Sequence, residues 1–346
     1  GDEFLALRHL HAKKDLHSKV DQLCAQFDSL FEVAGVQVKA GASVGVSQYP
    51  ENGSSATELL RYADEGMYFA KQRGDGAPRI FDDGMQVGLE RRLTVEKQLH
   101  RAIERGELSV VYQPKRNVSS GQIDAAEALL RWHNPELGVV SPAEFIPIAE
   151  ECGMIMALGD WVIDQVCAQL VRWQNNGRKH LCVAINLSAS HLRDQSVPLA
   201  VAERLRRNRI DAGSLEFEMT EDVFVEDADA VVDNLKALRH LGIGIAIDDF
   251  GTGYSSLAYL RSLPVDVLKI DRSFVSQMEQ RGDSNTIVNA CLMMAHGMNL
   301  KVVAEGVENA EQEQMLVQMG CDYLQGYHIA KPLNVEDFES LLAGGG

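Results

Sequence analysis

Short apolar runs that end in a charged or amide side chain recur along most of this 346-residue chain, and this repetition constrains its fold more than any other feature. The clearest example lies within Ile243–Asp271. There an apolar run ends in Asp248 and Asp249, and a second apolar run, Val265–Asp271, contains Lys269. Side chains alternate between the two faces of a strand. An apolar strand with a charge at its C-terminal end, repeated along the chain, is what an α/β barrel with its active site at that end would produce.

Asp249 would break this alternation if its strand continued past Asp248. We expect the strand to end there and the backbone to turn, because Gly251 and Gly253 follow and glycine adopts the backbone conformations that tight turns need. The carboxylate of Asp249 then joins that of Asp248 on the inner face.

From Glu107 onward, about eight strand-like segments alternate with helical patterns, which predicts a TIM-type (β/α)8 barrel over residues 107–346. The expected strands are Leu108–Gln113, Ile123–Arg131, Leu181–Leu187, Leu215–Met219, the run that ends at Asp248, Val265–Asp271, Val302–Glu305 and Tyr323–Ile329. The charged stretch 83–106 predicts a linker helix, and residues 1–82 predict part of a separate α/β domain. The length is sufficient for a barrel of roughly 250 residues and a smaller piece.

The alternation and the strand ends together predict one cluster of polar side chains at the barrel mouth. Its expected members are Glu127, Asn186, Glu218, Asp248, Asp249, Lys269, Glu305 and Gln325. Their outward neighbours, such as Ile185, Ile247 and Val302, are apolar, as a ring of covering helices requires. Glu216 also falls on the inner face, below Glu218, and we expect it to lie near the exposed lower end of its strand.

Five carboxylates in one pocket cannot all remain ionised unaided, because like charges raise one another's pKa values. Divalent cations remove this conflict. An oxygen-only donor set with one amide and no His or Cys favours Mg²⁺ or Mn²⁺ over zinc. Two such ions suit five acids and Asn186, as in two-metal phosphodiester cleavage. Lys269 then either positions the attacking hydroxide and neutralises phosphate charge, or forms a buried salt bridge with a neighbouring acid, and the two interpretations are compatible.

Composition excludes some partners and locations. The net charge of −17 argues against a surface for a nucleic-acid duplex. The six cysteines are scattered, which favours reduced core thiols in a cytoplasmic protein. No apolar run is long enough to span a bilayer and no signal peptide is found, so we expect no membrane segment in this chain, although a full-length protein could be anchored upstream.

Three motifs in the first 82 residues resemble the second half of a GGDEF diguanylate cyclase domain. They are Gly1-Asp2-Glu3-Phe4, Ala42-Ser43-Val44-Gly45-Val46-Ser47 and Ala63-Asp64-Glu65-Gly66-Met67-Tyr68-Phe69-Ala70-Lys71. The family's first half, with a metal-binding Asp and the phosphate loop, is missing, and Glu3 alone could represent the cyclase's metal ligands. The resemblance therefore implies a truncated regulatory or scaffolding segment without cyclase activity.

Residues 90–343 resemble an EAL phosphodiesterase domain, because every motif of that family occurs in order. The motifs are Gln113-Pro114, Glu127-Ala128-Leu129-Leu130-Arg131, Asn186-Leu187-Ser188, Glu218-Met219-Thr220-Glu221, Asp248-Asp249-Phe250-Gly251-Thr252-Gly253-Tyr254-Ser255-Ser256-Leu257, Leu268-Lys269-Ile270-Asp271, Ala304-Glu305-Gly306-Val307-Glu308 and Gln325-Gly326-Tyr327. The resemblance implies that the substrate is cyclic di-GMP, hydrolysed to linear pGpG.

The resemblance also implies a role for each matching position. One metal ion would be held by Glu127, Asn186, Glu218 and Asp248, and the other by Asp248, Asp249 and Glu305. The catalytic group would comprise Lys269, on the nucleophilic water, with Glu305, Asp249 and Glu127. Substrate contacts or support of the ligands would come from Gln113, Arg131 and Gln325.

Glu221 would brace the loop from Asp249 to Ser256, which in this family lies near the dimer contact, so we expect a homodimer through this domain. Two alternatives stay open. One is a receptor that binds cyclic di-GMP without hydrolysing it, and the other is a scaffold whose dimer contacts regulate an upstream sensor. The complete set of acids favours hydrolysis over both.

Overall fold

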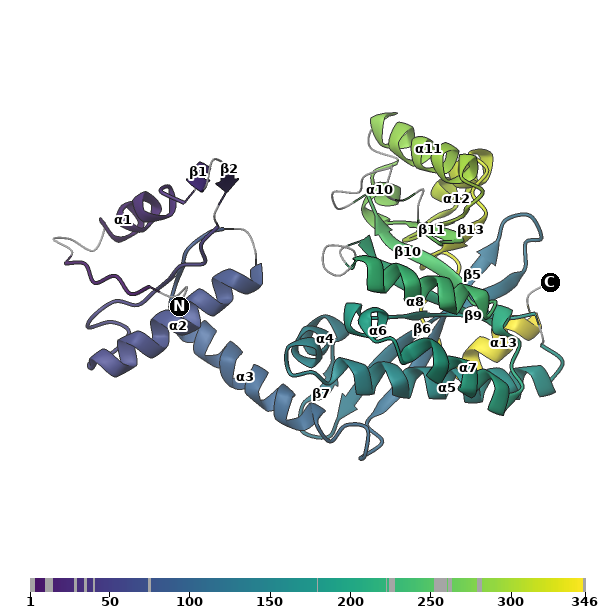
Figure 1. Ribbon diagram of the computed structural model, residues 1–346, viewed down its shortest axis with the longest axis horizontal. Coiled ribbons are helices and arrows are strands. Elements are labelled where there is room, and N and C mark those ends of the chain that lie inside the picture. Colours follow the sequence, from purple (N-terminus) through teal and green to yellow (C-terminus); the bar gives the residue numbers. More distant parts are fainter. Residues whose placement is uncertain are drawn as a thin grey trace. The chain divides into compact units, whose positions relative to one another are not determined.

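The computed structural model describes residues 4–9, 15–27, 30–33, 36–39, 41–73, 76–178, 180–221, 223, 228–251, 260, 263–278 and 282–344. The chain divides into two compact units, Gly1–Val95 and Glu96–Gly346 (Figure 1). Gly1, Asp2 and Glu3 of the first cyclase-like motif and residues 252–259 of the loop after Asp249, which include Gly253, lie outside the described residues. No helix in the described part of the chain is both long and apolar enough to cross a membrane.

The described residues of the N-terminal unit form short strands and three helices. Its elements are α1 (Asp15–Cys24), β1 (Leu30–Val33), β2 (Val36–Lys39), β3 (Gly45–Val46), α2 (Ala56–Arg73), β4 (Arg79–Ile80) and α3 (Asp83–Leu99), the last of which continues into the second unit. β1 pairs with β2 in antiparallel fashion, and β3 pairs with β4 in parallel. A Cβ on Gly45 would collide with the backbone of Ala63 and Met67, so β3 packs on α2 only with glycine at this position.

Eight strands of the second unit close into a barrel, as the sequence predicts. In order around the ring they are β5 (Leu108–Asn117), β6 (Ile123–Asn134), β8 (Cys182–Asn186), β9 (Leu215–Thr220), β10 (Gly244–Phe250), β11 (Val267–Ile270), β12 (Lys301–Ala304) and β13 (Tyr323–Gln325), and β13 pairs with β5 to complete it. A ninth strand, β7 (Gly138–Val140), pairs with the far end of β6.

Helices surround this barrel (Figure 1). They are α4 (Pro142–Glu151), α5 (Ile155–Asn175), α6 (Ala189–Arg193), α7 (Val197–Asn208), the short 3-10 helix η1 (Ala212–Ser214), α8 (Ala228–His240), α10 (Arg272–Ser276), α11 (Gly282–Gly297), α12 (Ala310–Gln318) and α13 (Val335–Gly344). The main apolar core lies between these helices and the outward strand residues, among them Ile185, Ile247 and Val302. Three inward residues, Ala246, Val267 and Val303, form a separate small cluster.

The first strand departs from a regular (β/α)8 pattern. β5 runs antiparallel to both β6 and β13, and residues 118–122 alone separate it from β6. Parallel neighbours need a crossover of a dozen residues or more, so this short turn forces the antiparallel direction. Gly121, with φ of 71°, lies in the turn. The strand end expected at Gln113 is wrong, since β5 continues through Pro114 to Asn117.

Candidate active site and metal centre

Lys269 lies at the centre of the inward-facing acids. It is completely buried on β11, and its Nζ lies 2.7 Å from Glu218 Oε2, 2.9 Å from Asp248 Oδ2 and 2.7 Å from Glu305 Oε1. Glu127 Oε2 is 3.6 Å from the same nitrogen. Four carboxylates from different parts of the ring therefore share one ammonium group. This geometry is the buried salt bridge, which is one of the two compatible interpretations of Lys269 given in the sequence analysis.

The acids form two overlapping groups suited to cations. One carboxylate oxygen each from Glu127, Glu218 and Asp248 lie within 4.8 Å of one another, and the same holds for Asp248, Asp249 and Glu305. Asp248 belongs to both groups and is placed to bridge them. Every donor is an oxygen atom, which suits a hard ion such as Mg²⁺ or Mn²⁺. The residues present therefore fit a metal site, and their division into two groups fits two ions.

Glu127 is held by amide side chains on both of its carboxylate oxygens. Asn186 Nδ2 donates to Glu127 Oε1 at 2.7 Å, and Gln325 Nε2 donates to Glu127 Oε2 at 2.7 Å. Gln325 Nε2 also lies 3.3 Å from Gln113 Oε1, and Gln113 Nε2 donates to the backbone oxygen of Ala330 at 3.5 Å. The structure therefore brings Gln113 and Gln325 together beside Glu127, where they fix its orientation.

Asp249 reaches the site by a route that differs from the expected one. β10 does not end at Asp248 but continues to Phe250, and its register against β11 shifts between Ile247 and Phe250. Asp249 has a φ of 53°, and its backbone N–H donates to Asp248 Oδ1 at 2.8 Å. Such a bulge redirects a side chain, and Asp tolerates the left-handed conformation better than most residues. The strand therefore bulges at Asp249 itself, before Gly251.

Glu221 and Arg131 lie at the edge of the site. Glu221 Oε1 accepts a hydrogen bond of 3.2 Å from the backbone nitrogen of Gly251, where the loop after β10 begins. Arg131 is half-buried on β6, four residues beyond Glu127, and its Nη1 donates to the backbone oxygen of Leu130 at 2.9 Å. Burial lowers the pKa of Arg131, while Tyr327 and Glu127 oppose this shift.

The acids differ in how readily they lose a proton. Burial, together with the charges of Asp248 and Glu127, raises the pKa of Glu305 to about 8 against the opposing effect of Lys269. Burial also raises the pKa of Glu127. For Glu218 burial acts in the same direction, but Lys115 and Lys269 outweigh it and lower the pKa to about 2. The site thus contains one acid, Glu218, whose pKa is lowered, beside Glu305 and Glu127, whose pKa values are raised.

A second buried lysine, Lys115, is a site residue that the sequence analysis missed. Its Nζ lies 2.6 Å from Glu218 Oε1 and 3.0 Å from Glu216 Oε1. The expectation that Glu216 lies at an exposed strand end is wrong, because its side chain is only 14% exposed and is paired inside the barrel. The alternation contained the signal, since Lys115 shares a face with Gln113, but the expected strand stopped too early.

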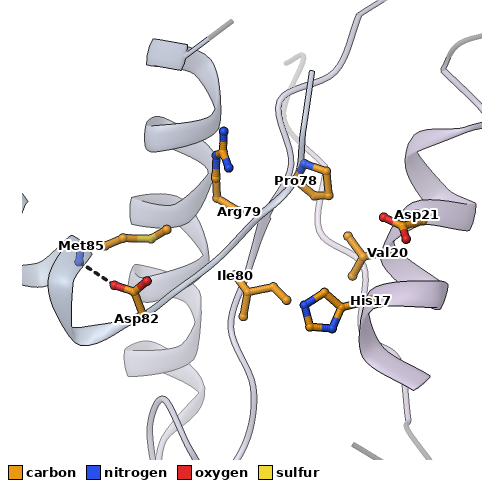
Figure 2. A pocket seen from close by; sticks show the side chains of 8 residues that line it. All are labelled: His17, Val20, Asp21, Pro78, Arg79, Ile80, Asp82 and Met85. Atoms are coloured by element: carbon orange, nitrogen blue, oxygen red, sulfur yellow. Dashed lines mark hydrogen bonds between the residues drawn. The ribbon is translucent and has the colours of Figure 1, made fainter. Parts of the chain in front are cut away.

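The N-terminal unit has a recess of its own (Figure 2). It is lined by His17, Val20, Asp21, Pro78, Arg79, Ile80, Asp82 and Met85. Asp82 Oδ1 accepts a 3.0 Å hydrogen bond from the Met85 backbone nitrogen, an ordinary helix-start contact. The two acid groups that could hold cations both lie in the barrel, among the residues that the structure describes. The barrel interior is therefore the candidate site.

The fold and the site define an α/β barrel protein with a cluster of acidic side chains inside the barrel that is consistent with a cation site. The chain belongs to the EAL domain family, which its residues 96–332 match, and residues 1–77 match the family described as diguanylate cyclase, GGDEF domain. Both resemblances drawn from the sequence motifs are thereby confirmed.

Curated relatives cover almost all of this chain. The bifunctional diguanylate cyclase/cyclic di-GMP phosphodiesterase MucR of Pseudomonas aeruginosa is 36% identical over 343 residues, which are 99% of this chain and 50% of MucR. The cyclic di-GMP phosphodiesterase PdeR of Escherichia coli is 35% identical over 339 residues, which are 98% of this chain and 51% of PdeR. The chain thus spans about half the length of these relatives.

Solved structures show the same barrel. A PaMucR phosphodiesterase in complex with c-di-GMP is 40% identical in sequence, with a TM-score of 0.68, and the match covers 71% of this chain and 99% of that one. A FimX EAL domain from Pseudomonas aeruginosa bound to c-di-GMP matches at 26% identity with a TM-score of 0.64, over 69% of this chain and 96% of that one.

Proposed function

We propose that this chain hydrolyses cyclic di-GMP to linear pGpG with two divalent cations, Mg²⁺ or Mn²⁺. The observation that carries the proposal is the convergence of five carboxylates, in two groups that share Asp248, at one end of an EAL-family barrel. The names of MucR and PdeR and the c-di-GMP complex of the matching barrel support the substrate and the reaction.

The proposed ligands follow the two acid groups. Glu127, Asn186, Glu218 and Asp248 would hold one ion, and Asp248, Asp249 and Glu305 the other. Bound there, the ions would supply Lewis-acid activation of water and of the phosphodiester. Asn186 and Gln325 keep Glu127 in one orientation through bonds of 2.7 Å each. Such preorganisation reduces the reorganisation that the reaction requires.

Lys269, Glu305, Asp249 and Glu127 are the proposed catalytic group. The Lys269 ammonium offsets the negative charge of the acids, and with cations bound to those acids it would donate a hydrogen bond to the attacking water. Arg131, Gln113 and Gln325 would contact the substrate or support the ligands. Glu221 would brace the loop after Asp249 through its bond to Gly251.

A second candidate is a receptor that binds cyclic di-GMP without cleaving it. One observation favours it: Lys269 contacts three of the acids at 2.7–2.9 Å and offsets their charge, so an intramolecular cation already stabilises the pocket. The two candidates predict the same binding and differ only in product.

The test is incubation of the chain with cyclic di-GMP and Mg²⁺, followed by chromatography for the linear dinucleotide. We expect product with Mg²⁺, none with EDTA, and product again when Mg²⁺ is added in excess of EDTA. Binding of cyclic di-GMP without product at any Mg²⁺ or Mn²⁺ concentration would establish the receptor. Absence of both binding and product would refute both candidates.

The remaining expectations concern organisation. We propose that residues 1–82 form a cyclase-like segment without cyclase activity, that 83–106 link it to the barrel domain at 107–346, and that the barrel domain forms a homodimer in the cytoplasm. Sedimentation equilibrium at micromolar concentration tests the dimer, and incubation with GTP and Mg²⁺ tests the absence of cyclase activity.

A further inference from the structure

Each oxygen of the Glu218 carboxylate is held by a different lysine. Lys269 Nζ lies 2.7 Å from Oε2, and Lys115 Nζ lies 2.6 Å from Oε1. Glu218 is completely buried, as is Lys269, and Lys115 is 2% exposed. Charge-assisted hydrogen bonds at these distances are among the strongest polar contacts in a protein. The two lysines therefore fix the orientation of the Glu218 carboxylate plane.

The two lysines have different partners, and this separates their roles. Lys269 also contacts Asp248 and Glu305, which belong to the candidate cation groups. Lys115 contacts Glu218 and Glu216, and Glu216 is in neither of those groups. Oε2 of Glu218 thus faces the other acids, while Oε1 points down the barrel to a separate ion pair.

The strand register explains how Lys115 reaches this position. On β5 it lies opposite Ala125 of β6 and Gln325 of β13, two residues below Gln113 on the same face. Glu216 on β9 lies between Ala184 of β8 and Gly244 of β10. Of these neighbours Ala125, Ala184 and Gly244 are small, and they leave the space that the long side chains of Lys115 and Glu216 fill.

We propose that Lys115 is a positioning residue for the metal centre, because it holds Oε1 of Glu218 and thereby presents Oε2 to the cation. This inference rests on the proposed function, in which Glu218 is a metal ligand. Residues that orient a metal-ligating side chain by a hydrogen bond typically contribute about 10- to 100-fold to metal affinity or activity. Glu216 makes the second, longer contact with Lys115, and Glu218 itself supplies the closest counter-charge for this buried lysine.

The decisive variant is Lys115→Met combined with Glu216→Gln. It removes one positive and one negative charge, so the net charge of the barrel interior is unchanged while Glu218 loses its hold on Oε1. Glu216→Gln alone is the matched control, because it keeps the contact between Lys115 and Glu218. If the double variant does not melt cooperatively, Lys115→Met with Glu216→Met replaces it, since apolar substitution of a buried pair is often neutral or stabilising.

The primary readout is Mn²⁺ binding by calorimetry without substrate, together with kcat and KM for cyclic di-GMP. We expect the double variant to bind Mn²⁺ at least about tenfold more weakly and to lose kcat by a similar factor, with KM within about threefold of the unmodified value. Glu216→Gln should stay within about threefold in all three quantities. A purely structural role would lower the melting temperature and leave the Mn²⁺ affinity of the folded protein unchanged.

A folded double variant that binds Mn²⁺ as tightly as the unmodified chain overturns the inference, as does an equal loss in Glu216→Gln. Failure of the proposed hydrolysis is visible separately. An unmodified chain that binds Mn²⁺ but forms no product refutes hydrolysis, and the Mn²⁺ affinities of the variants still decide the role of Lys115. An unmodified chain that binds no Mn²⁺ overturns both.

Discussion

Gly326 offers a sharp test of how β13 is held beside the site. A Cβ on Gly326 would collide with the backbone nitrogen and oxygen of Val307, a residue with no exposed surface. These two atoms are already engaged: Val307 N donates to Gln325 O at 3.0 Å, and Val307 O accepts from His328 N at 2.9 Å. Because the obstacle is backbone, Gly326→Ala must displace the 325–328 segment and break one or both bonds.

Each buried backbone group left without a partner costs about 1–3 kcal/mol, so we expect Gly326→Ala to lower the free energy of unfolding by about 2–5 kcal/mol. The gain from a stiffer unfolded chain, about 0.4–1 kcal/mol, does not offset this loss. Gln325 would also shift from Glu127, so kcat should fall. The assay is urea unfolding followed by tryptophan fluorescence, since Trp132, Trp161 and Trp173 all lie in the barrel unit.

The matched control is Gly297→Ala, at the last residue of α11, where a Cβ would meet nothing within 4 Å. Alanine is the better helix former by up to about 1 kcal/mol, so this variant should be as stable as the unmodified chain or slightly more stable. A Gly326→Ala protein within about 0.5 kcal/mol of the unmodified chain, or an equal loss in both variants, would refute the reasoning.

Four further predictions concern the acids and their lysine. Asp248→Asn should abolish hydrolysis in a folded protein, measured as the linear dinucleotide formed. Asp233→Asn, on the exposed face of α8, is the control and should leave hydrolysis unchanged. Retained turnover in Asp248→Asn would contradict the role of Asp248 as a ligand shared by both ions. Lys269→Met should lower kcat by at least about 100-fold with a smaller change in KM, and equal changes in both would remove its assignment to the attacking water. Glu305, with a pKa of about 8 before cations bind, should release a proton on Mg²⁺ binding at pH 7. This release is seen as a buffer-dependent heat that is absent at pH 9.5 and smaller in Glu305→Gln. The folded state holds that proton more tightly than the unfolded state. Glu305 should therefore make the cation-free protein less stable as the pH rises from about 4.5 to about 8. A rise in stability over that range, in the unmodified chain relative to Glu305→Gln, would contradict the raised pKa.

Alternation along strands predicted much of the site. It assigned Glu127, Asn186, Asp248 and Glu305 to the inner face, and the structure brings all four into or beside the acid cluster. It worked because one face of each strand had to be apolar to meet the surrounding helices, which left a single face for the polar residues. The number of strands and their closure into a barrel followed from the repetition of apolar runs that end in polar residues.

The sequence analysis missed two features. The bulge at Asp249 depends on a left-handed backbone and a register shift against β11, and the alternation of side chains along a strand predicts neither. Lys115 was missed because Pro114 suggested the end of a strand, and proline is uncommon inside a sheet. The bulge reflects tertiary pairing that local patterns do not encode, whereas Lys115 obeys the alternation and was lost only because the expected strand was too short.

The reversed direction of β5 has a consequence for how this domain can be controlled. Because β5 starts opposite Trp132, beyond the level of Glu127, the polypeptide joins the barrel at the rim that holds the acids and not at the opposite end. In a barrel whose strands all run in the same direction, a displacement of the preceding segment would first reach the end away from the acids. Here a twist or displacement transmitted along the backbone from upstream would reach Gln113, and through it the Glu127 side chain, within a few residues.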